Sequence, residues 1–389
     1  MEVSGHFCQR NGRDFGGAIL IAALLLESHF AAAADVEIGA VGDAAFIGEL
    51  AALHESPKNF LERRLRGVTE LLAPDLNFIN IEASITRTCT DFQEKTWQFA
   101  TTPASVAAFV RTGFNLIALA NNHSIDCSAP SSRTEIGPAL AEVRRLSKPA
   151  APAPGSVPRP LVFHGVARNA TALREVAIVE VRSVRIGMVS IKGWASGARQ
   201  NVGNLDNRRM IFEALRDAPV DVRILSLHGG EESVRRPSIA MIRVAREFVA
   251  LYRGDIVLGH HPHVTQGVEL LRRQDGRVAA MIYSLGNFLH DGLSRRGDGM
   301  LARFAVNRSG FVPDSLALIP LAAPSWRPAA IKPENLPKKL SPITESSTWL
   351  GQTLLRGELT RVPFDIVQES APVPRARVKP AQPWTLASP

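Results

Sequence analysis

Short apolar runs alternate with longer amphipathic stretches from Asp35 onward, a pattern typical of a mixed α/β domain. In the longer stretches apolar residues recur at spacings of three and four, as at Phe248, Leu251 and Tyr252, which predicts helices. The predicted strands are residues 36–41, 76–81, 116–119, 177–181, 184–191, 222–227, 256–258 and 279–284. The predicted helices are residues 60–72, 105–112, 133–146, 207–218 and 237–253.

Two Pro-rich stretches interrupt this alternation. Residues 149–160 are predicted to form a loop inside the main domain. Beyond about residue 320 the chain becomes rich in Pro, Ser and Lys, with a helical segment near 348–359 and a poorly ordered tail. The predicted organisation is therefore an N-terminal targeting segment at 1–34, a main domain at 35–325, and a partly disordered Pro-rich extension at 326–389.

The N-terminal segment has the layout of a secretory signal. Arg10 and Arg13 precede an apolar run at 15–26, and small residues follow at 31–34. The run is short for a membrane span, so we expect a signal peptide cleaved close to Ala34, with an uncleaved membrane anchor as the alternative. Either case predicts an exported protein that is periplasmic or otherwise extracytoplasmic.

Export changes the meaning of the three cysteines. Cys8 lies before the apolar run and would be lost on cleavage, which leaves Cys89 and Cys127. Two thiols in an oxidising compartment are a candidate disulfide, and two unpaired thiols are the alternative.

The net charge of +8 and the pI near 9.8 favour anionic partners, such as acidic polymers, phosphates or lipid headgroups. Aromatic residues make up 6% of the chain and include only two Tyr, so stacking platforms for nucleic-acid bases are few. We therefore expect no nucleic-acid partner.

Polar residues of metal-ligand types follow the ends of six predicted strands. They are Asp43; Asn80 with Glu82; Asn121, Asn122 and His123 with Asp126; His228 with Glu232; His260, His261 and His263; and Asn287. In an open α/β sheet, ligands bind at the carboxyl ends of the strands, so these side chains are expected to converge on one site. A mixed oxygen and nitrogen ligand set suits Mn, Zn, Fe or Mg, and paired ions of this kind clamp phosphoryl oxygens.

Taken singly, most of these motifs have a structural alternative. Gly42-Asp43 is often a simple turn, Glu82 can cap a helix, and a single His228 at a strand end can be a hydrogen-bonded structural residue. The segment from Gly259 to His263 is harder to explain in this way, because it places three imidazoles in four positions. Buried imidazoles need partners, so this segment predicts metal binding.

The six motifs, together with Gln266 and the run from Tyr283 to Phe288, occur in an order that resembles the CapA family of capsule and poly-γ-glutamate synthesis proteins. The resemblance covers roughly residues 36–291. It implies a metallophosphoesterase-like fold, a four-layer α/β/β/α sandwich with the site at one edge of two stacked sheets. It also implies a pair of divalent metal ions as cofactor.

The resemblance further implies roles for individual residues. The implied metal ligands are Asp43, Glu82, Asn122, His228, His261 and His263. His123 would protonate a leaving oxygen and Asp126 would orient it. The residues implied to support the ligands or to contact substrate are Asn80, Asn121, Glu232, His260 and Asn287.

Two aspects of the resemblance bear on the loops around the site. The family pattern has aromatic residues where this chain has Gly229 and Ser233, so the resemblance does not predict the identity of the substrate. The resemblance also places Cys89 in the loop after Glu82 and Cys127 in the loop after His123. Both loops would border the site, so it implies a Cys89–Cys127 disulfide.

Two functional hypotheses remain at this point. The first is an exported metal-dependent hydrolase that acts on a phosphoester or an acidic cell-envelope polymer, with His123 as general acid. The second is a non-catalytic component of capsule-polymer assembly or export, acting in a membrane-associated synthesis complex and retaining the metal site. An open site favours the first hypothesis and a closed site the second.

Overall fold

The computed structural model describes residues 35–45, 57–87, 89, 92–127, 130–148, 160–197, 201–290, 299–322, 329–330, 335–350 and 366–368. The described residues from Val36 onward form one compact unit, to which the description below applies. The predicted targeting segment at 1–34 lies outside the described residues. None of the helices that the structure describes combines the length and the apolar character needed to cross a membrane.

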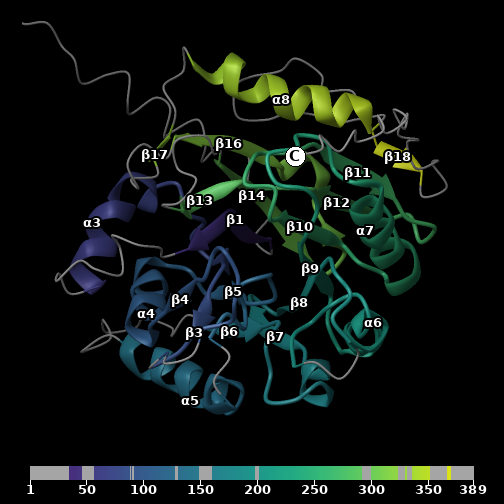
Figure 1. The fold of residues 1–389 in the computed structure, drawn as a ribbon. Helices are drawn as coiled ribbons and strands as arrows, with labels where there is room; N and C mark the ends of the chain where they lie inside the picture. The colour runs from purple at the N-terminus through teal and green to yellow at the C-terminus, as the bar shows by residue number, and fades with distance from the viewer. Residues whose placement is uncertain are drawn as a thin grey trace, which may run out of the picture. The chain divides into compact units, whose positions relative to one another are not determined.

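The strands of this unit form two large sheets and one small one (Figure 1). The first sheet has the order β17 (Ala329–Ala330), β16 (Ala317–Ala322), β14 (Gly299–Asn307), β1 (Val36–Ala45), β2 (Leu76–Ile81), β5 (Leu116–Ala118), β6 (Val162–His164). In addition, β13 (Asn287–His290) pairs with β1, and β15 (Gly310–Phe311) pairs with β14.

The second sheet has the order β18 (Ile366–Gln368), β11 (Val268–Arg272), β12 (Val278–Ile282), β10 (Ile256–His260), β9 (Val222–His228), β8 (Val184–Lys192), β7 (Ala177–Val181). The small sheet joins β3 (Ser84–Ile85) and β4 (Ala100–Thr101). Neighbouring strands at the centre of each large sheet run parallel: β1, β2 and β5 in the first, and β8, β9, β10 and β12 in the second. Each group therefore delivers its carboxyl ends to one edge.

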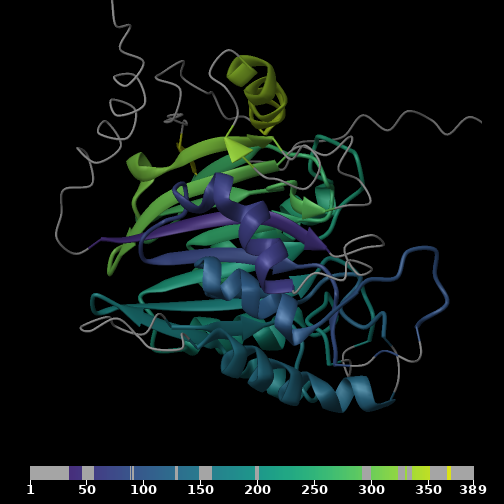
Figure 2. The same cartoon turned by 90° about the vertical axis from the view of Figure 1, so that its left-hand side faces the viewer.

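The two large sheets pack face to face, and helices cover their outer faces. One apolar cluster fills the space between the sheets, with Phe78 and Phe304 from the first sheet and Ile224 and Leu258 from the second. The first sheet buries its other face against α3 (Pro57–Thr69), α4 (Pro103–Thr112) and α5 (Pro130–Ser147). Figure 2 looks onto this side, where α3 and α4 lie in front of the strands.

The outer face of the second sheet packs on α6 (Arg208–Asp217) and α7 (Ile239–Tyr252), through side chains such as Phe212 and Phe248. Two 3₁₀ turns, η1 (Thr171–Arg174) and η2 (Pro313–Ser315), complete the connections. The four-layer α/β/β/α sandwich predicted for this chain is thus confirmed.

The helices of the main domain begin and end within about three residues of the predicted positions, and their termini follow ordinary capping chemistry. Thr102 and Ser238 accept a hydrogen bond from the backbone N–H of the first turn of α4 and α7, and Pro103 opens α4. The predicted strand at 256–258 extends to His260, and the strand at 222–227 extends to His228.

The segment beyond residue 325 contributes elements to the same unit. The helix α8 (Leu336–Trp349) starts earlier than the helix expected near 348–359, and residues 351–359 lie outside the described part. Ile343 of α8 is buried in the cluster between the sheets. Ser346 and Ser347 accept hydrogen bonds from the backbone N–H groups of Gly267 and Val268 at the start of β11, each at 2.9 Å. These bonds satisfy donors that the strand would otherwise bury.

Candidate metal centre

The carboxyl ends of β1, β2, β5, β9 and β10 meet at one edge of the sandwich and bring together the residues implied as ligands. Asp43 lies near the end of β1, Glu82 directly follows β2, and Asn122 lies in the turn after β5. His228 ends β9, and His261 directly follows β10. Residues that are far apart in the sequence thus meet because parallel strands end at a common edge.

Asp43 is fully enclosed within the cluster. Its Oδ2 accepts a hydrogen bond of 3.0 Å from the backbone N–H of His261. Its Oδ1 lies 3.3 Å from His260 Nδ1 and 3.7 Å from His228 Nδ1, and its Oδ2 lies 3.7 Å from His263 Nδ1. Asp43 is fully buried, so its carboxylate is surrounded by imidazoles and by no solvent.

Glu82 faces the same imidazoles from the opposite side. Its Oε1 lies 3.6 Å from His228 Nε2 and 3.8 Å from His263 Nε2, and its Oε2 lies 3.8 Å from His290 Nε2. Among the described residues, neither carboxylate oxygen has a hydrogen-bond partner. Three sets of ligand atoms lie within 4.8 Å of one another: Glu82, His228 and His261; Glu82, His263 and His290; and Glu232, His261 and His263.

This arrangement fits a divalent metal ion. A buried polar group without a partner costs about 1–3 kcal/mol, more when it is charged, and within the described residues both oxygens of Glu82 and the ring nitrogens of His260 and His290 are in that state. Ligand-atom separations of 3.6–3.8 Å around Glu82 are too long for hydrogen bonds. Two atoms that each lie about 2.1 Å from one ion at a tetrahedral angle are about 3.4 Å apart. These buried groups can therefore hold a metal.

The pKa values of the two buried carboxylates of the cluster shift in opposite directions. Burial raises the pKa of Glu82 well above its usual range, and the negative charge of Asp43 raises it further. Burial acts in the same direction on Asp43, but the imidazoles of His260 and His228 outweigh it and hold the pKa of Asp43 far below its usual range. A bound cation would stabilise both carboxylates in the ionised form.

Burial keeps His228 and His261 neutral. It lowers the pKa of His228 well below the usual value, and burial together with the nearby His263 lowers the pKa of His261 to about 4. A neutral imidazole has a free ring nitrogen, which is the form that ligates metal. In this structure His228 Nε2 donates a 2.7 Å hydrogen bond to Asn122 Oδ1, so ligation by His228 Nε2 would require the tautomer with its proton on Nδ1.

His123 and Asp126 form a hydrogen-bonded pair beside the cluster. His123 Nδ1 donates to Asp126 Oδ2 at 2.5 Å, and its Nε2 lies 3.9 Å from Glu82 Oε1. The ring of Phe99 stacks on the imidazole with a centroid distance of 3.7 Å, and Lys95 forms an ion pair with Asp126 Oδ1. Burial lowers the pKa of His123, and the hydrogen bond from its ring to Asp126 opposes that shift. Asp126 therefore orients His123 with Nε2 toward the cluster.

The two loops that carry this pair are joined covalently. The structure pairs Cys89 with Cys127, whose α-carbons lie 5.7 Å apart, in the manner that the resemblance implied. Ser84 Oγ donates to the carbonyl oxygen of His123 at 3.0 Å and accepts from the backbone N–H of Cys127 at 3.1 Å. The backbone N–H of Gln93 donates to the carbonyl oxygen of Asp126 at 2.8 Å. The position of His123 is thus fixed from both loops.

Two glycines allow the strand ends to approach this closely. A β-carbon on Gly42 would lie 1.8 Å from the carbonyl oxygen of Gly286, and one on Gly259 would lie 2.0 Å from that of Tyr283. Both distances are impossible for any other residue. The sequences Gly42-Asp43 and Gly259-His260 therefore have a steric cause as well as a chemical one.

The segment with three histidines has an unusual backbone. His261 and His263 have φ angles of 95° and 56°, in the left-handed region that non-glycine residues rarely adopt. Such conformations cost on the order of 1–3 kcal/mol each and concentrate at functional sites. Surrounding hydrogen bonds hold the turn in place, since Ser233 N–H donates to the carbonyl oxygen of Pro262 at 2.8 Å and Gly229 N–H to that of His260 at 2.9 Å.

The asparagines predicted to support the site lie beside it. Asn80 Nδ2 donates to Asp43 Oδ1 at 2.8 Å and contacts His228 Nδ1 at 3.1 Å. Asn287 Oδ1 accepts from His263 Nδ1 at 2.9 Å. Asn121 instead shapes the turn, because its Nδ2 donates to the carbonyl oxygen of Ile81 at 2.8 Å and its Oδ1 accepts from the backbone N–H of His123. His260 packs on Phe78 beneath the cluster.

Four residues that contact the site were not predicted from the sequence: Lys95, Phe99, Trp194 and His290. Trp194 packs edge-on against His261 at a centroid distance of 4.7 Å, and it supplies an aromatic wall in a chain that has Gly229 at the family's aromatic position. A β-carbon on Gly229 would meet the sulfur of Met241 at 2.7 Å, so a larger side chain there would have to displace Met241. Trp194 closely follows the strand predicted at 184–191, and the strand-end argument applied to that strand would have found it.

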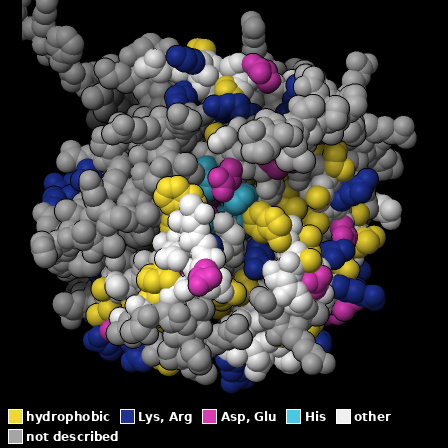
Figure 3. Space-filling model, viewed as in Figure 1, with side chains coloured by type: hydrophobic (Ala, Val, Ile, Leu, Met, Phe, Trp, Pro, Cys, Tyr) yellow, Lys and Arg dark blue, Asp and Glu magenta, His cyan; other side chains and the backbone are white. Residues whose placement is uncertain are grey.

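The cluster is open on one side. Asp43, Glu82 and His228 have 0% exposure, whereas His123, His261 and His263 retain 5–6%, and Glu232 is exposed. Figure 3 shows histidine side chains next to an acidic side chain near the middle of one face, bordered by hydrophobic side chains. His123, His261 and His263 are therefore the histidines of the cluster nearest to solvent.

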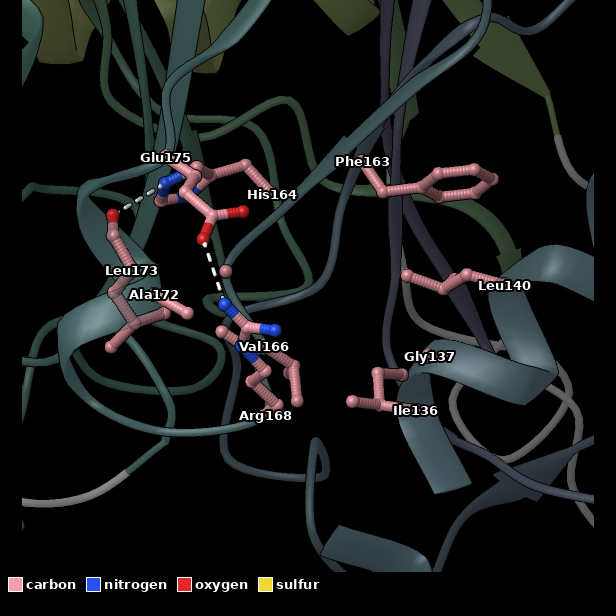
Figure 4. Close-up of a pocket in the computed structure, with 12 residues that line it drawn as sticks. Ile136, Gly137, Leu140, Phe163, His164, Val166, Arg168, Ala172, Leu173 and Glu175 are labelled. Carbon is pink, nitrogen blue, oxygen red and sulfur yellow. Dashed lines mark hydrogen bonds and ion pairs between the residues drawn. The ribbon is translucent and has the colours of Figure 1, made fainter. Parts of the chain in front are cut away.

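A separate pocket of about 270 Å³ lies between α5 and the segment after β6. Figure 4 shows Phe163 and Leu140 on one side, with Arg168 and Glu175 on the other, whose side chains form an ion pair at 3.6 Å. His164 lines this pocket, and both of its ring nitrogens are hydrogen-bonded.

Comparison with known proteins gives the family. Residues 37–140 and 158–292, more than half of the chain, match the family described as bacterial capsule synthesis protein PGA_cap. The chain belongs to this family. It is 26% identical over 218 residues to the capsule biosynthesis protein CapA of Bacillus anthracis, a match covering 53% of this chain and 47% of that protein. It is 25% identical over 285 residues to the PGA biosynthesis protein CapA of Bacillus subtilis, which covers 70% of this chain and 67% of that protein.

The match thus spans about half the length of the Bacillus anthracis member of the family. Among solved structures, a novel phosphatase from Mycoplasma pneumoniae aligns with a TM-score of 0.45 at 12% identity, covering 79% of this chain and 98% of that chain. A hypothetical protein from Thermus thermophilus aligns with a TM-score of 0.41 at 12% identity, covering 73% of this chain and 99% of that chain.

Proposed function

We propose that this member of the PGA_cap family is an exported, metal-dependent hydrolase that acts on a phosphoester or an acidic cell-envelope polymer. The observation that carries the proposal is the position of the His123–Asp126 pair, which borders the open side of a buried cluster of carboxylates and imidazoles. A purely structural cluster would have no need of a histidine at its rim that is oriented by a buried carboxylate.

The residues present fit two divalent ions of the Mn, Zn, Fe or Mg type. Glu82 faces imidazoles with both of its oxygens, and Asp43 does the same from the other side. The remaining donors implied by the family resemblance are Asn122, His228, His261 and His263. When bound, such ions polarise the oxygen under attack and lower the pKa of water.

His123 and Asp126 would then carry out the proton transfer to the leaving group. Water attacks the phosphorus or carbonyl carbon, a new bond to oxygen forms, and the bond to the leaving group breaks. His123, protonated on both ring nitrogens, gives its Nε2 proton to the leaving oxygen or nitrogen, and Asp126 holds the Nδ1 proton throughout. The proton that the attacking water loses passes to solvent. Such a positioned general acid contributes typically about 10²–10⁴-fold to the rate.

The charges around the site support an anionic substrate. Lys95 pairs with Asp126 beside His123, and Lys192 ends β8, whose register places it next to His228. Burial lowers the pKa of Lys192, and the nearby Lys95 lowers it further. An anionic group of a substrate bound between these lysines would offset their repulsion, and the net charge of +8 would help to attract it. The names of the relatives, which refer to capsule and PGA biosynthesis, suggest an acidic polymer as a class to test.

The second hypothesis is a non-catalytic component of polymer assembly or export within a membrane-associated synthesis complex. It draws on the relatives, which are named for biosynthesis. The open side of the cluster favours the hydrolase, because a site retained only for structure needs no access to solvent.

The test compares the wild type with His123→Gln, both loaded with Mn²⁺, on p-nitrophenyl phosphate, bis-p-nitrophenyl phosphate and poly-γ-glutamate. We expect the variant to keep its metal and lose about 10²–10⁴-fold in kcat on the substrate that the wild type cleaves. His164→Gln, a buried histidine outside the cluster, is the matched control and should retain activity. Full activity in His123→Gln would remove the proposed acid, and a metal-loaded wild type inactive on all three substrates would favour the assembly component.

A further inference from the structure

We propose that His290 is a metal ligand, which binds the same ion as His263 and Glu82, so that Glu82 takes part in two metal positions. The inference rests on the proposed metal centre and extends it to a residue of this chain outside the motifs that carry the family resemblance. Three observations support it: the partners of His290, the orientation of His263, and the local shape of β13.

The first observation is that His290 is buried without a hydrogen-bond partner. Its exposure is 3%, and within the described part of the chain neither ring nitrogen makes a hydrogen bond. Its Nε2 lies 3.8 Å from Glu82 Oε2, an oxygen that also lacks a partner there. An imidazole nitrogen and a carboxylate oxygen that face each other beyond hydrogen-bond distance fit one ion held between them.

The second observation is that His263 is turned toward the same carboxylate, that of Glu82. Its Nδ1 donates to Asn287 Oδ1 at 2.9 Å, so the proton sits on Nδ1 and the lone pair of Nε2 is directed to Glu82 Oε1 at 3.8 Å. A metal-bound histidine commonly donates its other ring N–H to a fixed acceptor in this way. The ring of His290 lies 4.8 Å from that of His263, so both can reach one ion.

The third observation explains how β13 brings both Asn287 and His290 to the site. Residues three apart on a regular strand point to opposite faces. The pairing of β13 with β1 shifts between Asn287, opposite Asp43, and Leu289, opposite Ala44, so β13 contains one extra residue. This bulge changes the alternation, and His290 comes to lie on the same side as Asn287.

The consequence is a division of the cluster into two positions. Glu82, His228 and His261 form one group of ligand atoms, and Glu82, His263 and His290 form the other. Glu82 belongs to both groups, which is the position of a bridging carboxylate in a two-metal site.

The test measures metal binding rather than activity. Full-length wild type, His290→Phe and the control His164→Gln are stripped of metal and titrated with Co²⁺ alone, with the visible absorption and the number of bound ions recorded. We expect about two ions in the wild type and in His164→Gln. In His290→Phe one ion should stay tight, while the other weakens at least about 10-fold and its absorption changes. His290→Gln, checked by circular dichroism, serves as a second variant if the Phe protein fails to fold.

The outcomes separate this inference from the function on which it rests. A wild type that binds no Co²⁺ would remove the metal centre as a whole. Two ions bound by His290→Phe and His290→Gln with wild-type affinity and spectrum would overturn only the role of His290. Weakening of both ions equally in these variants would also overturn it, because a ligand of one position must affect that position more.

Discussion

Two buried histidines, His164 and His290, occupy contrasting environments in the same sandwich. Both end a strand of the first sheet, both are nearly inaccessible, and burial lowers the pKa of His164 to about 4 and that of His290 to about 3. His164 Nε2 donates to the carbonyl oxygen of Leu173 at 3.0 Å (Figure 4), and its Nδ1 accepts from the backbone N–H of Ser190 at 2.9 Å. His290 has neither bond among the described residues.

This difference shows that burial and a lowered pKa do not distinguish a structural histidine from a metal ligand. The hydrogen-bond partners of the two ring nitrogens do distinguish them. His164 is satisfied, so it contributes to stability without any added group. Nε2 of His290 and both oxygens of Glu82 are unsatisfied together in one place among the described residues, and bound cations would satisfy all three atoms. Changes in the metal centre should therefore alter metal binding, and changes around His164 should alter only stability.

The largest effect is expected from the double change His261→Ala/His263→Ala. It removes two imidazoles that reach both the buried carboxylates and the open side. We expect tightly bound metal to be lost and hydrolysis to fall by at least about 10²-fold. Metal content measured by elemental analysis, with kcat on the same samples, checks this. Retention of metal in the double variant would mean that the His-x-His segment is not part of the centre.

An intermediate effect is expected from Cys89→Ser/Cys127→Ser. The disulfide closes a loop with a sequence separation of 38 residues and joins the segments that hold His123. Its loss should lower the free energy of unfolding by about 2–4 kcal/mol, mostly through the entropy of the unfolded chain. Urea unfolding of both proteins measures this. An unchanged unfolding midpoint would show that hydrogen bonds such as Ser84 Oγ to His123 are sufficient to hold the loops.

The smallest effect is expected from His164→Gln, which removes one or both hydrogen bonds of a satisfied residue. We expect a loss of about 1–3 kcal/mol in the free energy of unfolding at pH 7.5, with metal binding unchanged. A loss of metal in this variant would contradict the distinction between the two regions.

The same variant tests the pH dependence. The pKa of His164 is about 4 in the folded protein and near 6.5 when unfolded, so the unfolded chain binds its proton more readily. The stability that neutral His164 provides is complete above pH 6.5 and is lost as pH falls toward 4, by up to about 3 kcal/mol. In metal-free protein, His164→Gln should therefore lose less stability than the wild type between pH 6.5 and 4. Equal slopes would contradict the lowered pKa.

The order of elements and most of the centre were predictable because both follow from strand ends. Asp43, Glu82, His228 and His261 each lie at the carboxyl end of an apolar run, and parallel strands gather such ends at one edge. The pairing of the antiparallel strands β11, β14 and β16 was not predictable in this way, because it depends on contacts between distant segments.

The site residues that were not predicted from the sequence escaped prediction for different reasons. His290 reaches the site through a bulge, and regular strand alternation would place it on the face opposite to Asn287. Lys95 and Phe99 lie on a loop whose position depends on the disulfide and on Asp126. Loops of this kind carry no periodicity, so their path cannot be derived from pattern alone. Trp194 could have been predicted, because it closely follows the end of the strand predicted at 184–191.

The central claim is that the buried carboxylates and imidazoles bind metal, and the most direct measurement is the metal content of the full-length wild type. The protein is stripped with a chelator, reloaded with Mn²⁺, desalted, and analysed by mass spectrometry of its elements. We expect about two tightly bound ions per chain and a higher Tm in the loaded protein. A protein that retains no ion after loading, with the same Tm before and after, would contradict metal binding by this cluster.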